Sequence, residues 1–159
     1  MSKLVDIVIE TINKKVPLQE QLSYDRIHAQ LNHPDAEERI GVFSDYDDNE
    51  ITPEHLNRAL DDSDWRVRYR ASYHPNASSD NINKALSDQD VAVRTSALEN
   101  PNIEEHHISK ALNDSDANVR SDAIKHPKAT ENHLRSAIMD SNSDIRHYAV
   151  DTLYKMMNG

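Results

Sequence analysis

One acidic segment, residues 45–50, has residue types and a spacing that could bind a divalent cation. It reads Asp-Tyr-Asp-Asp-Asn-Glu, with oxygen-bearing side chains at alternate positions, as at the start of a calcium-binding loop. Such a loop also needs a sharp turn at its sixth residue, usually made by glycine, and a bidentate glutamate at its twelfth. Glu50 and Leu56 stand at those places, so the sequence favours a solvated acidic loop over a calcium site.

The histidines recur at a regular spacing, which raises the question of a zinc site. His107 and His133 stand 26 residues apart, and His106 directly precedes His107. Equivalent helices of neighbouring helical repeats lie about 10 Å apart, whereas zinc binds its ligands at about 2 Å. The adjacent pair points to different sides of a helix. We therefore interpret the histidines as solvated or turn-capping residues, and predict no metal and no cofactor.

The composition excludes several kinds of catalytic site. The 159 residues include no cysteine and two glycines, one of which is the last residue. Without cysteine there is no disulfide scaffold, zinc ribbon or thiol catalysis. One internal glycine cannot build a glycine-rich phosphate loop, which needs several residues with a free backbone. Because no nucleophile–base motif is visible either, we expect that the protein is not an enzyme.

Arginine and aromatic residues cluster in one short segment and give the strongest signal for binding. The segment 65–73 holds the single tryptophan and two of the six tyrosines of the chain. Arginine and aromatic side chains are enriched at binding hot spots because they bury a large area or form forked hydrogen bonds. The alternative is that the aromatic rings pack on the preceding segment and the arginines are solvated. We predict a partner-binding surface made of Trp65, Arg66, Tyr69, Arg70 and Tyr73 together with Asp45, Tyr46, Asp47 and Asp48.

The elements that must position these side chains belong to an internal repeat with a period of 26 residues. Segments that begin at residues 59, 85, 111 and 137 align without insertion. A fixed period of this kind is the signature of stacked repeats that share one continuous core. The matched positions are Leu60, Leu86, Leu112 and Ile138; Val67, Val93, Val119 and Ile145; Ala71, Ala97, Ala123 and Ala149; and Pro75, Pro101 and Pro127.

Each unit reads as two short helices. In the second unit, Thr52 before a proline is typical of a helix start, and Asp64 can cap the next helix, expected over 65–73. His74 before Pro75 ends it, because a residue before proline avoids the helical region. We divide one domain, 1–159, into an N-terminal cap (1–22), repeats 23–51, 52–77, 78–103, 104–129 and 130–155, and a C-terminal end (156–159).

Charged residues also recur in every unit. The acidic positions are Asp62, Asp88, Asp114 and Asp140, and the basic ones are Arg68, Arg94, Arg120 and Arg146. A catalytic residue is usually needed once, whereas a stacking contact is needed at each interface between repeats. We therefore predict a structural ladder in which each arginine pairs with an aspartate of its own or the adjacent unit. A further basic series, Arg58, Lys84 and Lys110, could follow phosphates but is more typical of a solvated face.

The motif D-x-D-x-x-V-R-x-x-A-x-x-H/N-P resembles HEAT-like repeats and, more closely, the leucine-rich repeat variant family. It begins at Asp62 and recurs as far as Arg146, so the resemblance covers about residues 23–155. The resemblance implies an all-α, right-handed α-solenoid of about five 26-residue two-helix HEAT-like repeats with an N-terminal capping helix. Proteins of this kind mostly serve as binding scaffolds.

Three functions agree with these patterns. The first, which we favour, is a non-enzymatic interaction module, such as an adaptor, scaffold or small inhibitor, with a protein partner. The second is nucleic-acid binding, including a loose resemblance to HEAT-like alkylpurine DNA glycosylases. The third is an acidic mimic of nucleic acid. The net charge of −10 argues against general binding to nucleic acid.

The acidity is concentrated in one part of the chain. Residues 33–66 carry 11 acidic and 3 basic side chains, which amounts to −8 of the net −10. This distribution argues against mimicry over the whole surface and favours one polarised site near the first two repeats. The apolar run at residues 4–10 is interrupted by Asp6 and Glu10 and is too short to span a membrane, which takes about 20 residues. It also lacks the pattern of a secretory signal. We expect a cytoplasmic protein with no membrane partner, and the sequence leaves the oligomeric state open.

Overall fold

The computed structural model describes residues 18–158, and this part of the chain is all-α, as predicted. It contains ten α-helices, one short 3-10 helix and no strand. No helix in the described part is both long and apolar enough to cross a membrane. The helices are α2 (Leu18–Gln30), α3 (Ala36–Asp45), η1 (Asp48–Glu50), α4 (Pro53–Ala59), α5 (Trp65–Ser72), α6 (Ser79–Ala85), α7 (Val91–Leu98), α8 (Glu105–Ala111), α9 (Ala117–Lys125), α10 (Glu131–Ala137) and α11 (Ser143–Asn158).

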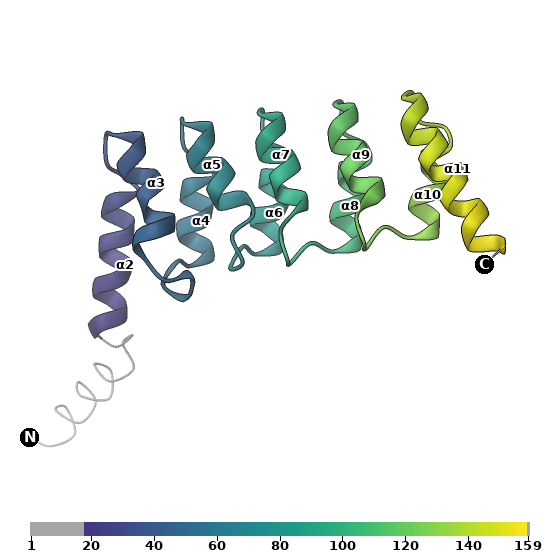
Figure 1. The fold of residues 1–159 in the computed structure, drawn as a ribbon. Helices are drawn as coiled ribbons and strands as arrows, with labels where there is room; N and C mark the ends of the chain where they lie inside the picture. The colour runs from purple at the N-terminus through teal and green to yellow at the C-terminus, as the bar shows by residue number, and fades with distance from the viewer. Residues whose placement is uncertain (1–17, 159) are drawn as a thin grey trace, which may run out of the picture.

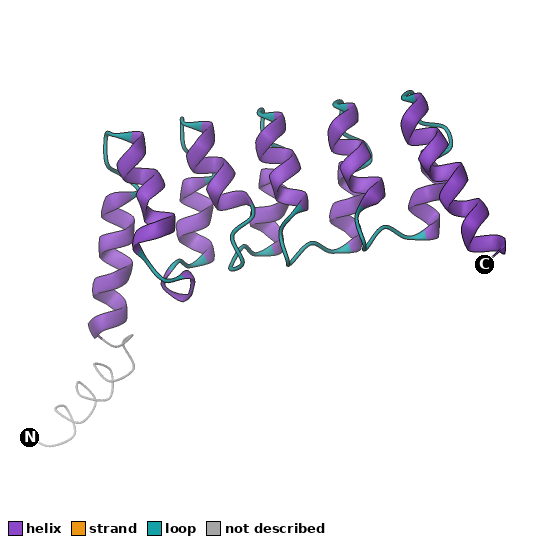
Figure 2. Ribbon diagram, in the orientation of Figure 1, coloured by secondary structure: helices purple, strands orange, loops and turns teal. Residues whose placement is uncertain are grey.

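The helices form antiparallel pairs that stand side by side in a row (Figure 1). Short turns join the two helices of each pair along one edge, and longer loops link successive pairs along the opposite edge (Figure 2). The second helix of each pair packs on its equivalent in the next, so that α5 lies between α3 and α7 and α9 lies between α7 and α11. The helices α2 and α11 lie at opposite ends of the row (Figure 1).

Side-chain caps explain where the helices begin. The Thr52 hydroxyl accepts a hydrogen bond from the His55 amide at the start of α4. Asp64 accepts from the Arg66 amide at the start of α5, and Asp90 and Asp116 do the same for α7 and α9. These caps satisfy amides that have no partner within the helix. The prediction of a helix over 65–73 is accurate to one residue, since α5 ends at Ser72.

The core runs along the row between the two layers of helices. Val67, Val93 and Val119 are fully buried, as are the alanines one turn later. Leu56, Ile82 and Ile108 from the first helices meet them from the other side. Since a helix of seven or eight residues is marginal alone in water, its stability comes from this packing.

The structure differs from the sequence division at the two ends. The boundary drawn between residues 22 and 23 falls inside α2, and the one between 155 and 156 falls inside α11. Most of the predicted cap, residues 1–17, lies outside the described residues. The additional residues of the first unit form the turn η1 within the acidic loop.

Candidate functional site

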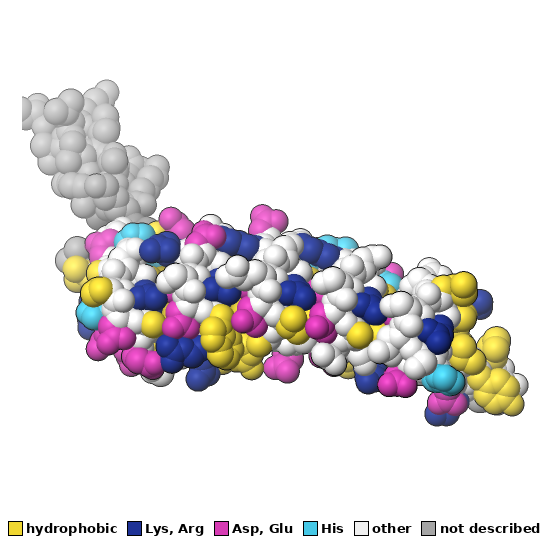
Figure 3. Space-filling model, turned by 90° about the horizontal axis from the view of Figure 1, so that it is seen from above, with side chains coloured by type: hydrophobic (Ala, Val, Ile, Leu, Met, Phe, Trp, Pro, Cys, Tyr) yellow, Lys and Arg dark blue, Asp and Glu magenta, His cyan; other side chains and the backbone are white. Residues whose placement is uncertain are grey.

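A ladder of arginine–aspartate pairs follows the edge where the short turns lie. Arg68 donates from Nε and Nη2 to both oxygens of Asp88, at 2.7 and 3.0 Å, and Arg94 binds Asp114 in the same way. Arg120 with Asp140 and Arg39 with Asp62 repeat the fork. Viewed from above, basic and acidic side chains alternate along this edge (Figure 3). Each of these four arginines therefore pairs with the aspartate of the following helix pair.

Every ladder residue also binds the backbone of its own turn. Arg94 Nη1 donates to the carbonyl oxygens of Asp88 and Gln89, and Asp114 Oδ1 accepts from the Asp116 amide. Burial by itself would raise the pKa of Asp114, but the hydrogen bonds from Arg94 and this amide outweigh it and lower the pKa. Arg94 thus makes four hydrogen bonds within the protein, and both oxygens of Asp114 accept one from it, which leaves little for an external ligand to bind.

Three buried histidines cap the first helices, so of the two alternatives, solvated or turn-capping, the capping role holds for these three. Nδ1 of His55, His107 and His133 accepts the amide of the residue before the helix, at 3.2, 2.9 and 3.0 Å. Asn81 occupies the same position in the third unit and caps with Oδ1. His107 is fully buried, and its Nε2 lies 3.1 Å from the Ser79 hydroxyl. The rings are hydrogen-bonding caps of the repeat.

Stability should fall at acid pH in two steps. Burial lowers the pKa of His55, His74, His107 and His126 below the usual 6.5, so the unfolded chain binds more protons below that pH. The free energy of unfolding should be constant above about pH 7 and then decrease, by up to about 1.4 kcal/mol per pH unit for each such histidine. The pKa values of Asp62 and Asp114 are lowered from the usual 3.8, which predicts a second decrease in the free energy of unfolding below about pH 3.8. Urea denaturation at a series of pH values checks this, and a flat profile between pH 7 and 5 would contradict it.

The basic series Arg58, Lys84 and Lys110 also makes contacts between units. Lys84 Nζ donates to the Asn57 carbonyl and pairs with Asp61, and Lys110 Nζ donates to the Asn83 carbonyl. Arg58 donates to the Asn32 side chain. Each of these cations binds groups of the preceding helix pair, so the series is not simply a solvated face and is not a free track for phosphates.

The predicted arginine and aromatic residues lie together on α5. We call Trp65, Arg66, Tyr69, Arg70 and Tyr73 the α5 face. Trp65 and Tyr69 contact edge to face with ring centres 6.2 Å apart, and Tyr69 and Tyr73 do so at 5.5 Å. Trp65 is 45% exposed, while the two tyrosines are half-buried. Spaced four residues apart, the rings form one stripe along the helix.

The two arginines of the α5 face differ in how far their charge is compensated. Arg66 forms ion pairs with Asp64 at 2.7 Å and with Glu37 of α3 at 2.5 Å. Arg70 donates to the Tyr73 hydroxyl at 2.7 Å and has no ion pair among the described residues. Hydrogen bonds from the Arg66 side chain and amide lower the pKa of Asp64 to about 2, which makes this carboxylate a poor general base.

The acidic loop lies against the C-terminal end of α5. Asp48 Oδ1 is 3.3 Å from His74 Nε2, and the Asn76 side chain donates to the Asp48 carbonyl. The Asp45 side chain accepts a hydrogen bond from the side-chain amide of Gln30, while Tyr46 is half-buried against the core. Asp47 and Asp48 are exposed. The structure therefore brings the loop against His74 and Asn76, which follow α5, whereas Trp65 stands at the other end of the helix.

No group of three or more histidine or acidic side chains in residues 18–158 is arranged to hold a metal ion. Glu50, the last residue of the acidic loop, instead accepts from the Ser23 hydroxyl and the Asp47 amide. Comparison with known protein families and with curated proteins finds no match for this chain. The function therefore has to be inferred from the geometry of the chain itself.

Proposed function

We propose that the chain is a HEAT-like α-solenoid of five two-helix repeats that binds a protein partner through the α5 face and catalyses no reaction. The observation that carries this proposal is the stripe of Trp65, Tyr69 and Tyr73, in which half of a tryptophan is left in solvent. Rigid aromatic side chains supply contact area at low cost in conformational entropy, which is why they dominate binding hot spots.

Neighbouring helices support the assignment because they lack this stripe. At the positions of Trp65, Tyr69 and Tyr73, α7 carries Val91, Thr95 and Glu99. On α9 the same positions hold Ala117, Ser121 and Lys125. A feature needed for stacking would recur in each pair, as the arginine–aspartate ladder does. The aromatic stripe occurs once among the described helix pairs, so we assign it to recognition.

The charges near the stripe favour a protein over a nucleic acid. Arg66 is neutralised by Asp64 and Glu37, which leaves Arg70 as the one arginine of the face without an ion pair in the described residues. The acidic loop at the far end would repel phosphates. Binding to nucleic acid rests on many uncompensated cations, and this face offers too few. An Asp or Glu side chain of a protein partner would match Arg70.

The test uses a variant of α5 whose new residues already occur at the equivalent positions of another helix. Trp65→Ala with Arg70→Asp gives α5 the residues that α9 carries at the same positions, Ala117 and Asp122. Affinity capture from host lysate should fall at least about tenfold, because loss of a hot-spot residue costs about 2 kcal/mol or more. Capture should not change after nuclease treatment.

A matched variant controls for general surface effects. Asn118→Ala with Lys125→Ala alters two exposed residues on α9 and should leave capture unchanged. Equal melting temperatures of both variants would show that the fold is intact. Undiminished capture by the α5 variant would reject the proposed face, and loss of capture with nuclease would point to nucleic acid instead.

A further inference from the structure

The last helix pair exposes most of the large apolar side chains found on the surface. Seven such residues are exposed in the described part of the chain, and five of them follow residue 138. Figure 3 shows hydrophobic side chains gathered at one end of the row. The five are Met139, Val150, Tyr154, Met156 and Met157, exposed by between 51% and 86%. A concentration of this kind marks an interaction surface.

Residues at the same repeat position inside the row show that such a surface is normally covered by the next helix pair. Val150 stands at the position of Leu98 and Ile124, which are 3% and 2% exposed because the next helix pair covers them. Val150 itself is 51% exposed. In the described residues no helix packs on this side of α11, and an open groove lies there between α11 and the end of α10.

Arg146 is the last arginine of the ladder, and within the described residues it donates only from Nη1. Its Nη1 donates to the carbonyl oxygens of Asp140 and Ser141, as the inner arginines do on their own turns. The inner arginines also bind a carboxylate through Nε and Nη2. Arg146 meets no such carboxylate within residues 18–158, so this edge of its guanidinium group is available to another molecule.

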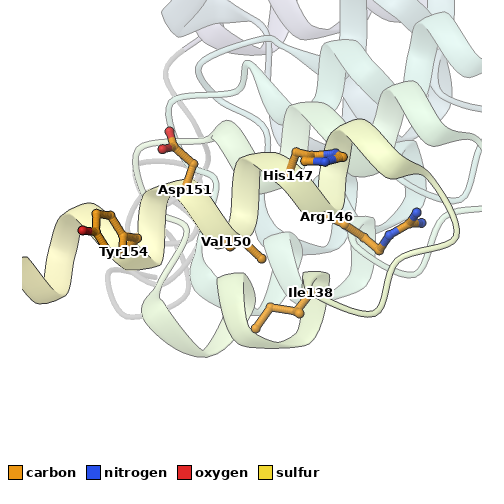
Figure 4. A pocket seen from close by; sticks show the side chains of 6 residues that line it. All are labelled: Ile138, Arg146, His147, Val150, Asp151 and Tyr154. Atoms are coloured by element: carbon orange, nitrogen blue, oxygen red, sulfur yellow. The ribbon is translucent and has the colours of Figure 1, made fainter.

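We propose that this C-terminal face, formed by Ile138, Arg146, Val150, Asp151 and Tyr154, binds the same face of a second copy of the chain. The five residues line one shallow groove, with Val150 and Ile138 between Arg146 and Tyr154 (Figure 4). The face carries a cation, an anion and an apolar centre. A two-fold axis brings each patch against its own equivalent, so such a face can complement itself.

An antiparallel arrangement of the two α11 helices gives Arg146 a carboxylate to bind. With the axis at Val150 and a rise of about 1.5 Å per residue, Arg146 stands opposite Tyr154 of the second copy. It lies about 5 Å along the helix from Asp151 of the second copy, within reach of its long side chain. Asp151 can turn toward Arg146 of the second copy, because its partner within the chain is the exposed Lys155 on the next turn. Each Arg146 then acquires the carboxylate that the inner arginines have.

A head-to-tail arrangement of copies does not supply that carboxylate. The turn between α2 and α3 would face Arg146, and its residue at the ladder position is His33. Nδ1 of His33 accepts the Asp35 amide, just as Asp62 Oδ1 accepts the Asp64 amide. The first turn thus offers a histidine where the inner turns offer an aspartate, and this favours the two-fold arrangement.

The test is the mass of the full chain in solution. Analytical ultracentrifugation at concentrations on the order of 100 µM should give twice the 18.1 kDa of one chain, with dissociation on dilution. Arg146→Asp and Asp151→Arg should each raise the dissociation constant at least about tenfold by placing like charges together. An equimolar mixture of the two variants should restore a dimer, because both contacts are then oppositely charged.

The mixture separates loss of binding from loss of folding, since a misfolded chain would not be rescued. Asp122→Arg on α9 makes the same charge change away from the face and should leave the dimer intact, as should the α5 double variant. A monomer at the highest concentration, failure of the mixture to restore the dimer, or open-ended growth of the assembly would each overturn the proposal.

Discussion

Replacing Asp114 by alanine should destabilise the protein by about 3 kcal/mol, the usual cost of removing one partner from a buried ion pair. The Arg94 and Asp114 side chains are 11% and 8% exposed, and water cannot readily replace the carboxylate. The change leaves Arg94 Nε and Nη2 without acceptors and the Asp116 amide without its turn partner. Urea denaturation followed by circular dichroism measures the loss.

An exposed pair provides the control for this prediction. Arg135 and Glu131 form an ion pair on α10 with side chains 58% and 52% exposed. Glu131→Ala should cost about 0.5 kcal/mol or less, because water and salt screen such a pair. Asp114→Asn should fall between the two variants, since the amide oxygen still accepts one hydrogen bond. Equal stability of Asp114→Ala and Glu131→Ala would show that the ladder does not stabilise the stack.

Replacing His107 by alanine should cost about 2–4 kcal/mol, because the change opens a cavity and removes a helix cap. The ring is fully buried, accepts the Glu104 amide at 2.9 Å and lies against Ser79 of the preceding unit. His107→Asn should cost about 1 kcal/mol, because its amide oxygen can cap as that of Asn81 does at 3.0 Å. The measurement is the free energy of unfolding at pH 7.

The asparagine variant also tests the origin of the acid sensitivity. Burial lowers the pKa of His107, so part of the expected loss of stability below pH 6.5 belongs to this ring. In His107→Asn the profile between pH 6.5 and 5 should be less steep than in the parent chain, while the step below pH 4 remains. An unchanged slope would assign the acid sensitivity to other groups.

Much of the fold could be predicted from the sequence because it depends on local patterns. Thr52, Asp64 and Pro75 mark the ends of helices, and the repeated valine and alanine positions mark the core. The sequence predicted arginine–aspartate pairs but left open whether each arginine pairs within its own unit or with the adjacent one, since a sequence spacing does not show which turn faces which. The structure shows that Arg94 binds its own turn and the next one together.

The environment of the polar residues was the hardest feature to predict. Histidine is polar by type, and nothing in the sequence shows that the ring of His107 is buried while a backbone amide satisfies its Nδ1. In the same way, Arg66 and Arg70 look alike in the sequence. Asp64 and, from α3, Glu37 compensate the charge of Arg66, whereas Arg70 has no ion pair within residues 18–158. Contacts between distant residues decide such differences.

The ladder has a consequence for how the length of this chain can change. Arg68, Arg94 and Arg120 each reach an aspartate 20 residues ahead in the same geometry, whichever neighbours are involved. Removal or duplication of one 26-residue unit would therefore rejoin an arginine to an equivalent aspartate. The chain can be shortened or lengthened in whole units during evolution or engineering. A few residues can also be added in a loop between helix pairs, since Arg39 still reaches both oxygens of Asp62 across the longer first unit.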